Sequence, residues 1–174
     1  YQRLNLEWGA LGDTRYLRSD YQFQQHFAIT NRYTYSFNAE IAYGIGLQGR
    51  PYPVFKNWSG GGLGSVRGFE QGTLGPIDAL GASIGGNKRI NLNHELYVPF
   101  PGAGNDRTLR LFGYVDAGNV WGENEPIKFK DFRASTGVGI SWVSPVGPLK
   151  LSYGKPFRYV DQDKIQKLQF QIGT

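Results

Sequence analysis

The sequence predicts an all-β fold, in which about eight antiparallel strands and one long loop form part of a transmembrane β-barrel. Apolar and polar residues alternate with period two in several segments, which is typical of strands. The connections between these segments are alternately long and short. Aromatic residues make up 15% of the 174 residues and glycine occupies 25 positions, yet the mean hydropathy is only −0.42. A barrel reconciles these values because polar side chains facing the lumen offset apolar side chains facing lipid.

The clearest alternation lies in 33–47, where one set of positions is apolar and the intervening set is small or polar. A helix would scatter both sets around its circumference, whereas a strand places them on opposite faces. Segment 133–143 shows the same separation. The apolar sets are Tyr33, Tyr35, Phe37, Ala39, Ile41, Tyr43, Ile45 and Leu47 in the first segment, and Ala134, Thr136, Val138, Ile140 and Trp142 in the second.

The remaining strands are shorter or less regular, and several approach the roughly 9–11 residues that a tilted strand needs to cross a bilayer. No segment has a convincing helical period. No run approaches the roughly 18 apolar residues of a membrane-spanning helix, so a helical membrane protein is excluded. These further strands are expected near 2–10, 21–29, 88–98, 108–120, 148–154 and 167–173.

Loop lengths distinguish a barrel from a soluble β-sandwich, whose strands also alternate. In outer-membrane barrels the periplasmic turns are short and the extracellular loops are long. This rule places the end of the chain in the periplasm, with 48–87 outside or folded back into the barrel. The longer connections are 11–20, 48–87, 121–132 and 155–166, and the shorter ones are 30–32, 99–107 and 144–147.

Several common functions find little support. The net charge is +5 and the pI is near 9.4, but the basic residues are scattered, so nucleic-acid binding is not expected. Residues 44–49 match the G-x-G-x-x-G string of dinucleotide sites, but 50–53 contain two prolines and cannot begin the helix that such a site requires. His26 and His94 lie near no recognisable nucleophile and acid. We therefore predict no catalytic residues, no metal site and no cofactor.

Two carboxylates are expected to face the lumen on neighbouring strands. Asp116 shares its face with Tyr114 and other large residues, and Glu95 occupies the corresponding face of the preceding strand. Arg67 lies on the glycine-rich loop 48–87 and could bond both carboxylates. The alternative is that Arg67 is solvated and that the carboxylates pair locally. The residue pattern alone leaves both possibilities open.

Four motifs, in this order, resemble those of BamA-type outer-membrane assembly proteins, within the superfamily of bacterial surface antigens and outer-membrane assembly barrels. The first resembles an inward-folded loop motif, the second a barrel motif, the third the turn before the penultimate strand, and the fourth the last strand. These motifs are 61–69 with Val66, Arg67, Gly68 and Phe69; 114–118 with Tyr114, Asp116 and Gly118; 142–149; and 168–173 with Leu168, Phe170, Ile172 and Gly173.

The resemblance implies that residues 1–174 are the C-terminal half of a barrel of roughly sixteen strands, without the periplasmic domains. It implies that Arg67 contacts Asp116, with Glu95 as a second partner, so that 48–87 plugs the lumen. It also implies that the last strand forms a weak seam through which client strands are templated by edge pairing. Family members continue to an aromatic residue beyond Thr174, so we expect further residues there. The pattern leaves open whether this piece closes by itself, pairs with a second copy or belongs to a longer chain.

The implied function is the folding and insertion of β-barrel proteins into the bacterial outer membrane, without enzymatic activity. The implied partners are unfolded outer-membrane clients, outer-membrane lipids and accessory assembly lipoproteins, the last through the periplasmic domains. Secretion transporters of the two-partner or autotransporter-assembly type are the first alternative, although 69–76 resembles the BamA type more closely. An outer-membrane enzyme is the second. Lys128, Lys130 and Arg133 could contact lipopolysaccharide phosphates, but solvated charges are the favoured interpretation.

Overall fold

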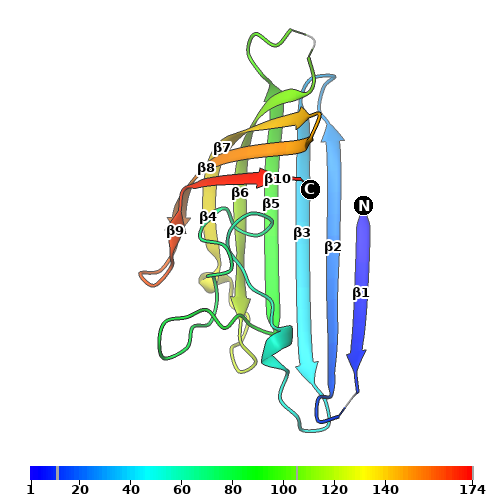
Figure 1. Ribbon diagram of the computed structural model, residues 1–174, viewed down its shortest axis with the longest axis vertical. Coiled ribbons are helices and arrows are strands. Elements are labelled where there is room, and N and C mark those ends of the chain that lie inside the picture. Colours follow the sequence, from blue (N-terminus) through cyan, green and yellow to red (C-terminus); the bar gives the residue numbers. More distant parts are fainter. Residues whose placement is uncertain (11, 105, 174) are drawn as a thin grey trace.

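An eight-stranded antiparallel sheet dominates the computed structural model, which describes residues 1–10, 12–104 and 106–173 (Figure 1). Leu11, Asn105 and Thr174, which belong to the expected loops 11–20 and 99–107 and to the end of the chain, lie outside the described residues. The sheet order is β1-β2-β3-β5-β6-β7-β8-β10, so β1 and β10 are its two edges. The strands are β1 (Gln2–Gly9), β2 (Tyr16–Ala28), β3 (Thr34–Gly46), β5 (Lys88–Pro99), β6 (Leu109–Trp121), β7 (Arg133–Ser144), β8 (Gly147–Arg158) and β10 (Leu168–Ile172).

Smaller elements lie outside this sheet. The short strands β4 (Gly68–Phe69) and β9 (Ile165–Gln166) pair with each other. The 3-10 helices η1 (Val54–Lys56) and η2 (Phe129–Asp131) have three residues each. In the described part of the chain, no helix combines the length and apolar character needed to cross a membrane.

The predicted all-β antiparallel fold is confirmed, and the main differences are in strand length. β2 begins at Tyr16 rather than near residue 21, and it therefore includes the charged residues Arg18 and Asp20. Their charges are accommodated on the inner face: Asp20 accepts a hydrogen bond from Asn5 at 2.9 Å, and Arg18 lies over the Trp58 ring at 4.2 Å. The connection expected over 11–20 is correspondingly shorter.

β8 extends to Arg158, beyond the expected end at residue 154. A proline normally ends a central strand because it has no N–H to donate. Pro156 is tolerated because the β7–β8 register shifts between Ala134 and Ser135, next to its partner position. The connection expected over 155–166 therefore begins later in the chain.

The two faces of the sheet reverse the usual arrangement of a soluble protein. In β3, Ile41 is 52% exposed on the outer face, while its neighbour Ala42 is 2% exposed on the inner face, together with buried Ser36. His94 also lies on the outer face, where its Nδ1 is 2.6 Å from the Tyr35 hydroxyl. Apolar side chains outside and polar side chains inside are the arrangement expected of a sheet whose outer face contacts lipid.

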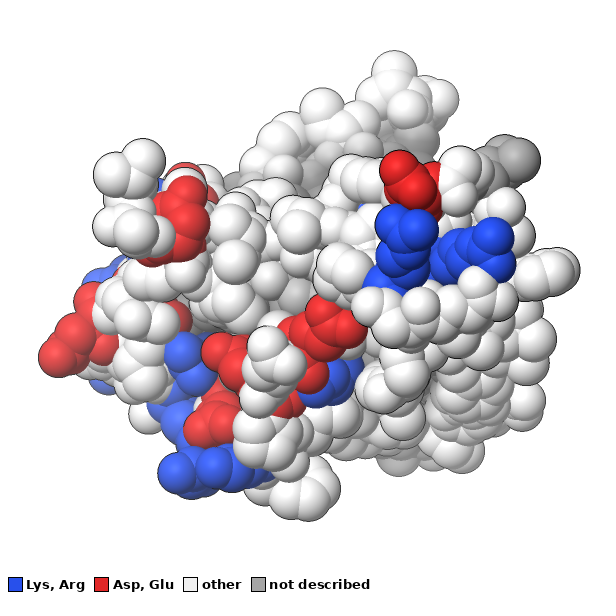
Figure 2. Space-filling model, turned by 90° about the horizontal axis from the view of Figure 1, so that it is seen from below, with Lys and Arg blue, Asp and Glu red and all other residues white. Residues whose placement is uncertain are grey.

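Most connections at one end of the sheet are longer than those at the other, as predicted, but 10–15 at the long-connection end is shorter than 100–108 at the opposite end. The end that is lower in Figure 1 carries 10–15, 47–87, 122–132 and 159–167, and the opposite end carries 29–33, 100–108 and 145–146. Figure 2 views the long-connection end, where acidic and basic residues are intermixed. Ion pairs such as Lys56 with Glu7 and Arg133 with Asp163 account for part of this mixture.

The long connection 47–87 supplies much of the buried apolar surface, because it packs against the inner face of the sheet. Two clusters result: Tyr52 and Trp58 of the connection pack with Tyr16 and Ala42 of the wall, and Val66, Phe69 and Leu74 pack together deeper inside. The segment that carries Arg67 is thereby held against β5, β6 and β10.

Candidate functional site

Arg67 is the centre of a buried ionic cluster between the long connection and the wall. Its side chain donates from Nε to Asp116 Oδ2 at 2.7 Å and from Nη2 to Asp116 Oδ1 at 2.8 Å. Its backbone N–H also donates to Asp116 Oδ2 at 3.0 Å, and Nη1 donates to Glu95 Oε1. Arg67 is only 6% exposed and Asp116 is fully buried. The bidentate fork fixes both the position and the orientation of the guanidinium.

Opposite charges balance within this cluster. Glu95 also contacts Lys150, whose Nζ is 3.6 Å from Glu95 Oε2, and accepts a hydrogen bond from the Tyr97 hydroxyl at 2.6 Å. Two cations therefore face two carboxylates, as buried charges require. Burial alone would lower the pKa of Arg67, but hydrogen bonds from Arg67 to Asp116 and the charges of both carboxylates outweigh burial and raise that pKa.

Aromatic rings of β6 form the floor on which the guanidinium rests. The Arg67 Cζ atom lies 3.8 Å from the centroid of the Tyr114 ring, a cation–π geometry. The Tyr114 ring fits because β7 and β8 have glycines where it crosses them. A Cβ on Gly154 would lie 2.2 Å from the Tyr114 hydroxyl, and one on Gly137 would lie 2.7 Å from its ring. The glycines thus create the space for the ring that supports Arg67.

Polar contacts on the N-terminal side of Arg67 hold the loop close to β5. The Ser65 hydroxyl donates to Asn91 Oδ1 at 3.0 Å, and Asn93 Nδ2 donates to the Ser65 carbonyl at 2.6 Å. Gly118 permits this approach, because a Cβ there would lie 2.7 Å from Asn91 Oδ1 and 3.1 Å from a Val66 methyl. The motif glycine of β6 therefore has a packing role.

Gln169 of the terminal strand holds the other side of the loop, and sequence reasoning missed it. Its Oε1 accepts from the Gly68 N–H at 3.1 Å, and its Nε2 donates to the Phe69 carbonyl at 2.8 Å. β4 also pairs with β9, and the Glu70 N–H donates to the Lys164 carbonyl at 2.9 Å. A glutamine on the inward face of a terminal strand, opposite to its apolar residues, was the available signal.

The other predicted residues of the terminal strand lie away from the loop. Leu168, Phe170 and Ile172 are exposed on the outer face of β10. The Gly173 N–H donates to the Pro148 carbonyl at 2.8 Å, beside the turn between β7 and β8. These residues are therefore not part of the Arg67 cluster.

The basic residues near η2 and the glycine string of 44–49 were weaker candidates for binding, and the structure shows what surrounds each. Arg133 is buried, with Nε 2.7 Å from Asp163 Oδ2, so it is not available to external phosphates. Lys128 and Lys130 are exposed near η2. Gly44 lies within β3, where a Cβ would lie 2.3 Å from the Tyr52 ring. Within the described ranges, no group of three or more His, Cys, Asp or Glu side chains could hold a metal ion.

Comparisons with known proteins agree with this architecture. Residues 1–174 match the Omp85 superfamily domain. BamA of Neisseria meningitidis is 38% identical over 177 residues, covering 85% of this chain and 22% of that protein. A SAM50-like protein of Schizosaccharomyces pombe is 25% identical over 187 residues, covering 99% of this chain and 39% of that protein. The chain thus spans well under half the length of these curated relatives.

Two solved structures resemble the fold. BamA from Haemophilus ducreyi lacking POTRA domains 1–3 matches with a TM-score of 0.86 and 28% identity, over 98% of this chain and 37% of that one. CdiB from Acinetobacter baumannii matches with a TM-score of 0.59 and 16% identity, over 90% of this chain and 26% of that one. The first match confirms the resemblance to BamA-type barrels, and the second shows a shared fold alone.

Proposed function

This chain belongs to the Omp85 superfamily and is part of a bacterial outer-membrane β-barrel, and we propose that its parent protein folds and inserts other β-barrel proteins into that membrane. The identity of 38% to a BamA over most of this chain carries the proposal. Because the chain spans only 22% of that relative, activity, clients and partners are proposed for the whole protein.

Within this function, we assign residues 1–174 to the C-terminal part of the barrel domain and 48–87 to a lumenal plug. The bonds of Arg67 to Asp116 and Glu95 support this assignment, because they connect the loop to β6 and β5. The bonds of Gln169 connect it to β10 as well. A loop held on both sides would brace the wall and close the lumen to free passage.

The terminal strand is suited to exchange its partner. β10 is an edge of the sheet and pairs with β8 on one side only. A free strand edge offers N–H and C=O groups to an incoming chain. We propose that unfolded clients are templated at this edge.

The proposed machine is not an enzyme and needs no nucleotide, because client folding supplies the driving force. Its other partners are outer-membrane lipids and accessory assembly lipoproteins, the latter bound by periplasmic domains outside residues 1–174. A secretion transporter is the second candidate, favoured only by the likeness to CdiB. At 16% identity that likeness bears on fold, so it ranks below assembly.

Depletion of the full-length parent in its own cells separates the two candidates. The measurement is the amount of several unrelated outer-membrane barrels that reaches the membrane in folded form. A joint fall of all of them, with unfolded barrels in the periplasm, supports general assembly. Unchanged barrels with the loss of one secreted protein would replace this proposal with a dedicated transporter.

A further inference from the structure

A groove of about 650 Å³ lies at the short-turn end of the sheet, between the 29–33 turn and the 100–108 connection. Its lining includes Tyr33, Val98 and Phe100. Because Thr34 pairs with Tyr97, the alternation of the strands places Tyr33 and Val98 on the outer face, and Phe100 continues that series. The groove is therefore an apolar trough on the surface that contacts lipid.

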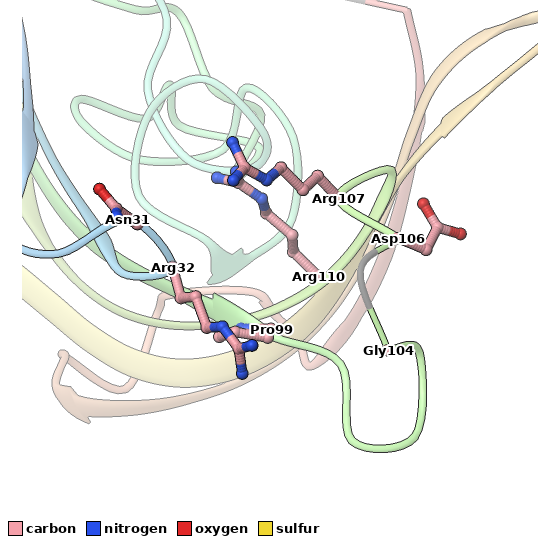
Figure 3. Close-up of a pocket in the computed structure, with 7 residues that line it drawn as sticks. All are labelled: Asn31, Arg32, Pro99, Gly104, Asp106, Arg107 and Arg110. Carbon is pink, nitrogen blue, oxygen red and sulfur yellow. The ribbon is translucent and has the colours of Figure 1, made fainter.

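Arg32 adds one positive charge to this trough. No acidic side chain pairs with it in the described part of the chain. Asp106, the nearby acid, instead accepts hydrogen bonds from the Thr108 N–H and hydroxyl, both at 2.7 Å. Figure 3 shows Arg32 pointing away from Arg107 and Arg110, which extend together in another direction. Arg32 therefore lines this groove and also, with Arg107 and Arg110, a neighbouring pocket.

The backbone beneath Arg32 is held in place. The Thr30 hydroxyl oxygen accepts hydrogen bonds from the N–H groups of Arg32 and Tyr33, both at 3.1 Å. The Ile29 N–H donates to the Tyr33 carbonyl at 3.0 Å. This closed turn fixes the backbone from which the Arg32 side chain extends.

Aromatic residues lie on the outer face immediately next to the groove. Phe27 and Tyr35 have ring centroids 6.0 Å apart, and Phe37 and His94 have ring centroids 4.8 Å apart. Aromatic girdles of barrels lie where hydrocarbon meets the headgroup layer. Since Arg32 lies in the turn beyond these rings, its charge stands at headgroup level.

We propose that this groove binds a phospholipid of the periplasmic leaflet, with the phosphate at Arg32 and an acyl chain along Tyr33, Val98 and Phe100. An arginine fork matches two phosphate oxygens, and the apolar lining matches hydrocarbon. An exposed cation beside an apolar trough at the membrane boundary fits this amphipathic ligand better than an acidic protein segment, which would leave the apolar lining unused. The inference depends on membrane location and not on the assembly activity.

Native mass spectrometry of the full-length parent, titrated with phosphatidylglycerol in mild detergent, tests the site. Arg32→Gln should lower the retained lipid about tenfold, because a hydrogen bond to a charged group is lost. Phe100→Ala should lower it as well, and Arg107→Gln, a neighbouring arginine directed elsewhere, should leave it unchanged. A heat-modifiable band for each variant verifies folding.

Three results would overturn the proposal. Equal lipid retention by Arg32→Gln and the parent protein would remove the phosphate contact. An equal loss in Arg107→Gln would indicate general attraction to a basic rim. Full competition by millimolar inorganic phosphate would show that the groove recognises a free anion and not a lipid.

Discussion

Replacement of Arg67 by alanine should destabilise the barrel substantially, because it leaves two carboxylates without their shared cation. Asp116 is fully buried and would have no opposite charge, and Glu95 would retain only Lys150 at 3.6 Å. Removing one partner of a buried ion pair typically costs about 3–5 kcal/mol. The loss of the cation–π contact with Tyr114 adds to this value in the same direction.

A double-mutant cycle that combines Arg67→Ala with Asp116→Asn in the full-length protein measures the coupling free energy between these two residues. The free energy of unfolding is measured by urea titration in detergent micelles, with heat-modifiable mobility as the readout. The bidentate geometry predicts a coupling of about 2 kcal/mol between the two positions. Arg50→Ala is the control, since its exposed pair with Asp13, at 3.3 Å, should contribute roughly 0–1 kcal/mol.

Two results would refute this reasoning. A coupling below about 0.5 kcal/mol would show that Arg67 and Asp116 act independently, within the error of additive sites. A loss of stability in Arg67→Ala no larger than that in Arg50→Ala would show that the cluster is screened by water. In either case the loop would be held mainly by its other contacts.

Two further predictions concern the strands around the loop. Gln169→Leu should raise the proteolytic susceptibility of the loop and lower stability by about 1–3 kcal/mol, because it leaves buried backbone groups unpaired. Gln171→Leu, on the same strand face but without a hydrogen bond to the described residues of the loop, should do neither. Gly154→Ala should lower stability by about 1–3 kcal/mol by displacing the Tyr114 ring, whereas Gly113→Ala, whose Cβ would meet nothing closer than 3.9 Å, should have little effect in the same urea titration.

Strand periodicity predicts most of the fold, because successive side chains in a strand point to opposite faces of the sheet. The same parity argument placed Asp116 and Glu95 on one face of neighbouring strands, and in the structure both contact Arg67. It missed the start of β2, where Arg18 and Asp20 find their partners on other segments, Glu7 and Trp58 for Arg18 and Asn5 for Asp20. It also ended β8 too early, and the register shift that accommodates Pro156 depends on β7.

The long connection was less accessible to such reasoning, because it has no period and its contacts are all long-range. The residue pattern offered Asp116 and Glu95 as partners of Arg67 but left a solvated Arg67 equally open, and the resemblance to a family favoured the contact with Asp116. Gln169 was missed because its place on the inward face of the terminal strand does not by itself identify its partners. Its role depends on the backbone of Gly68 and Phe69, roughly a hundred positions earlier in the chain.

The contacts of Gln169 limit how the terminal strand can separate from its neighbour. β10 is joined to β8 by its ladder and to the loop by Gln169, while the loop is joined to β5 and β6 through Arg67. If β10 separates from β8, either the two Gln169 bonds break or the loop follows the strand. If the loop followed the strand, Arg67 would separate from both carboxylates. Breaking that buried ion pair costs more free energy than breaking the two Gln169 hydrogen bonds. Opening therefore favours loss of the Gln169 bonds first, leaving the loop on the wall while the strand edge becomes free.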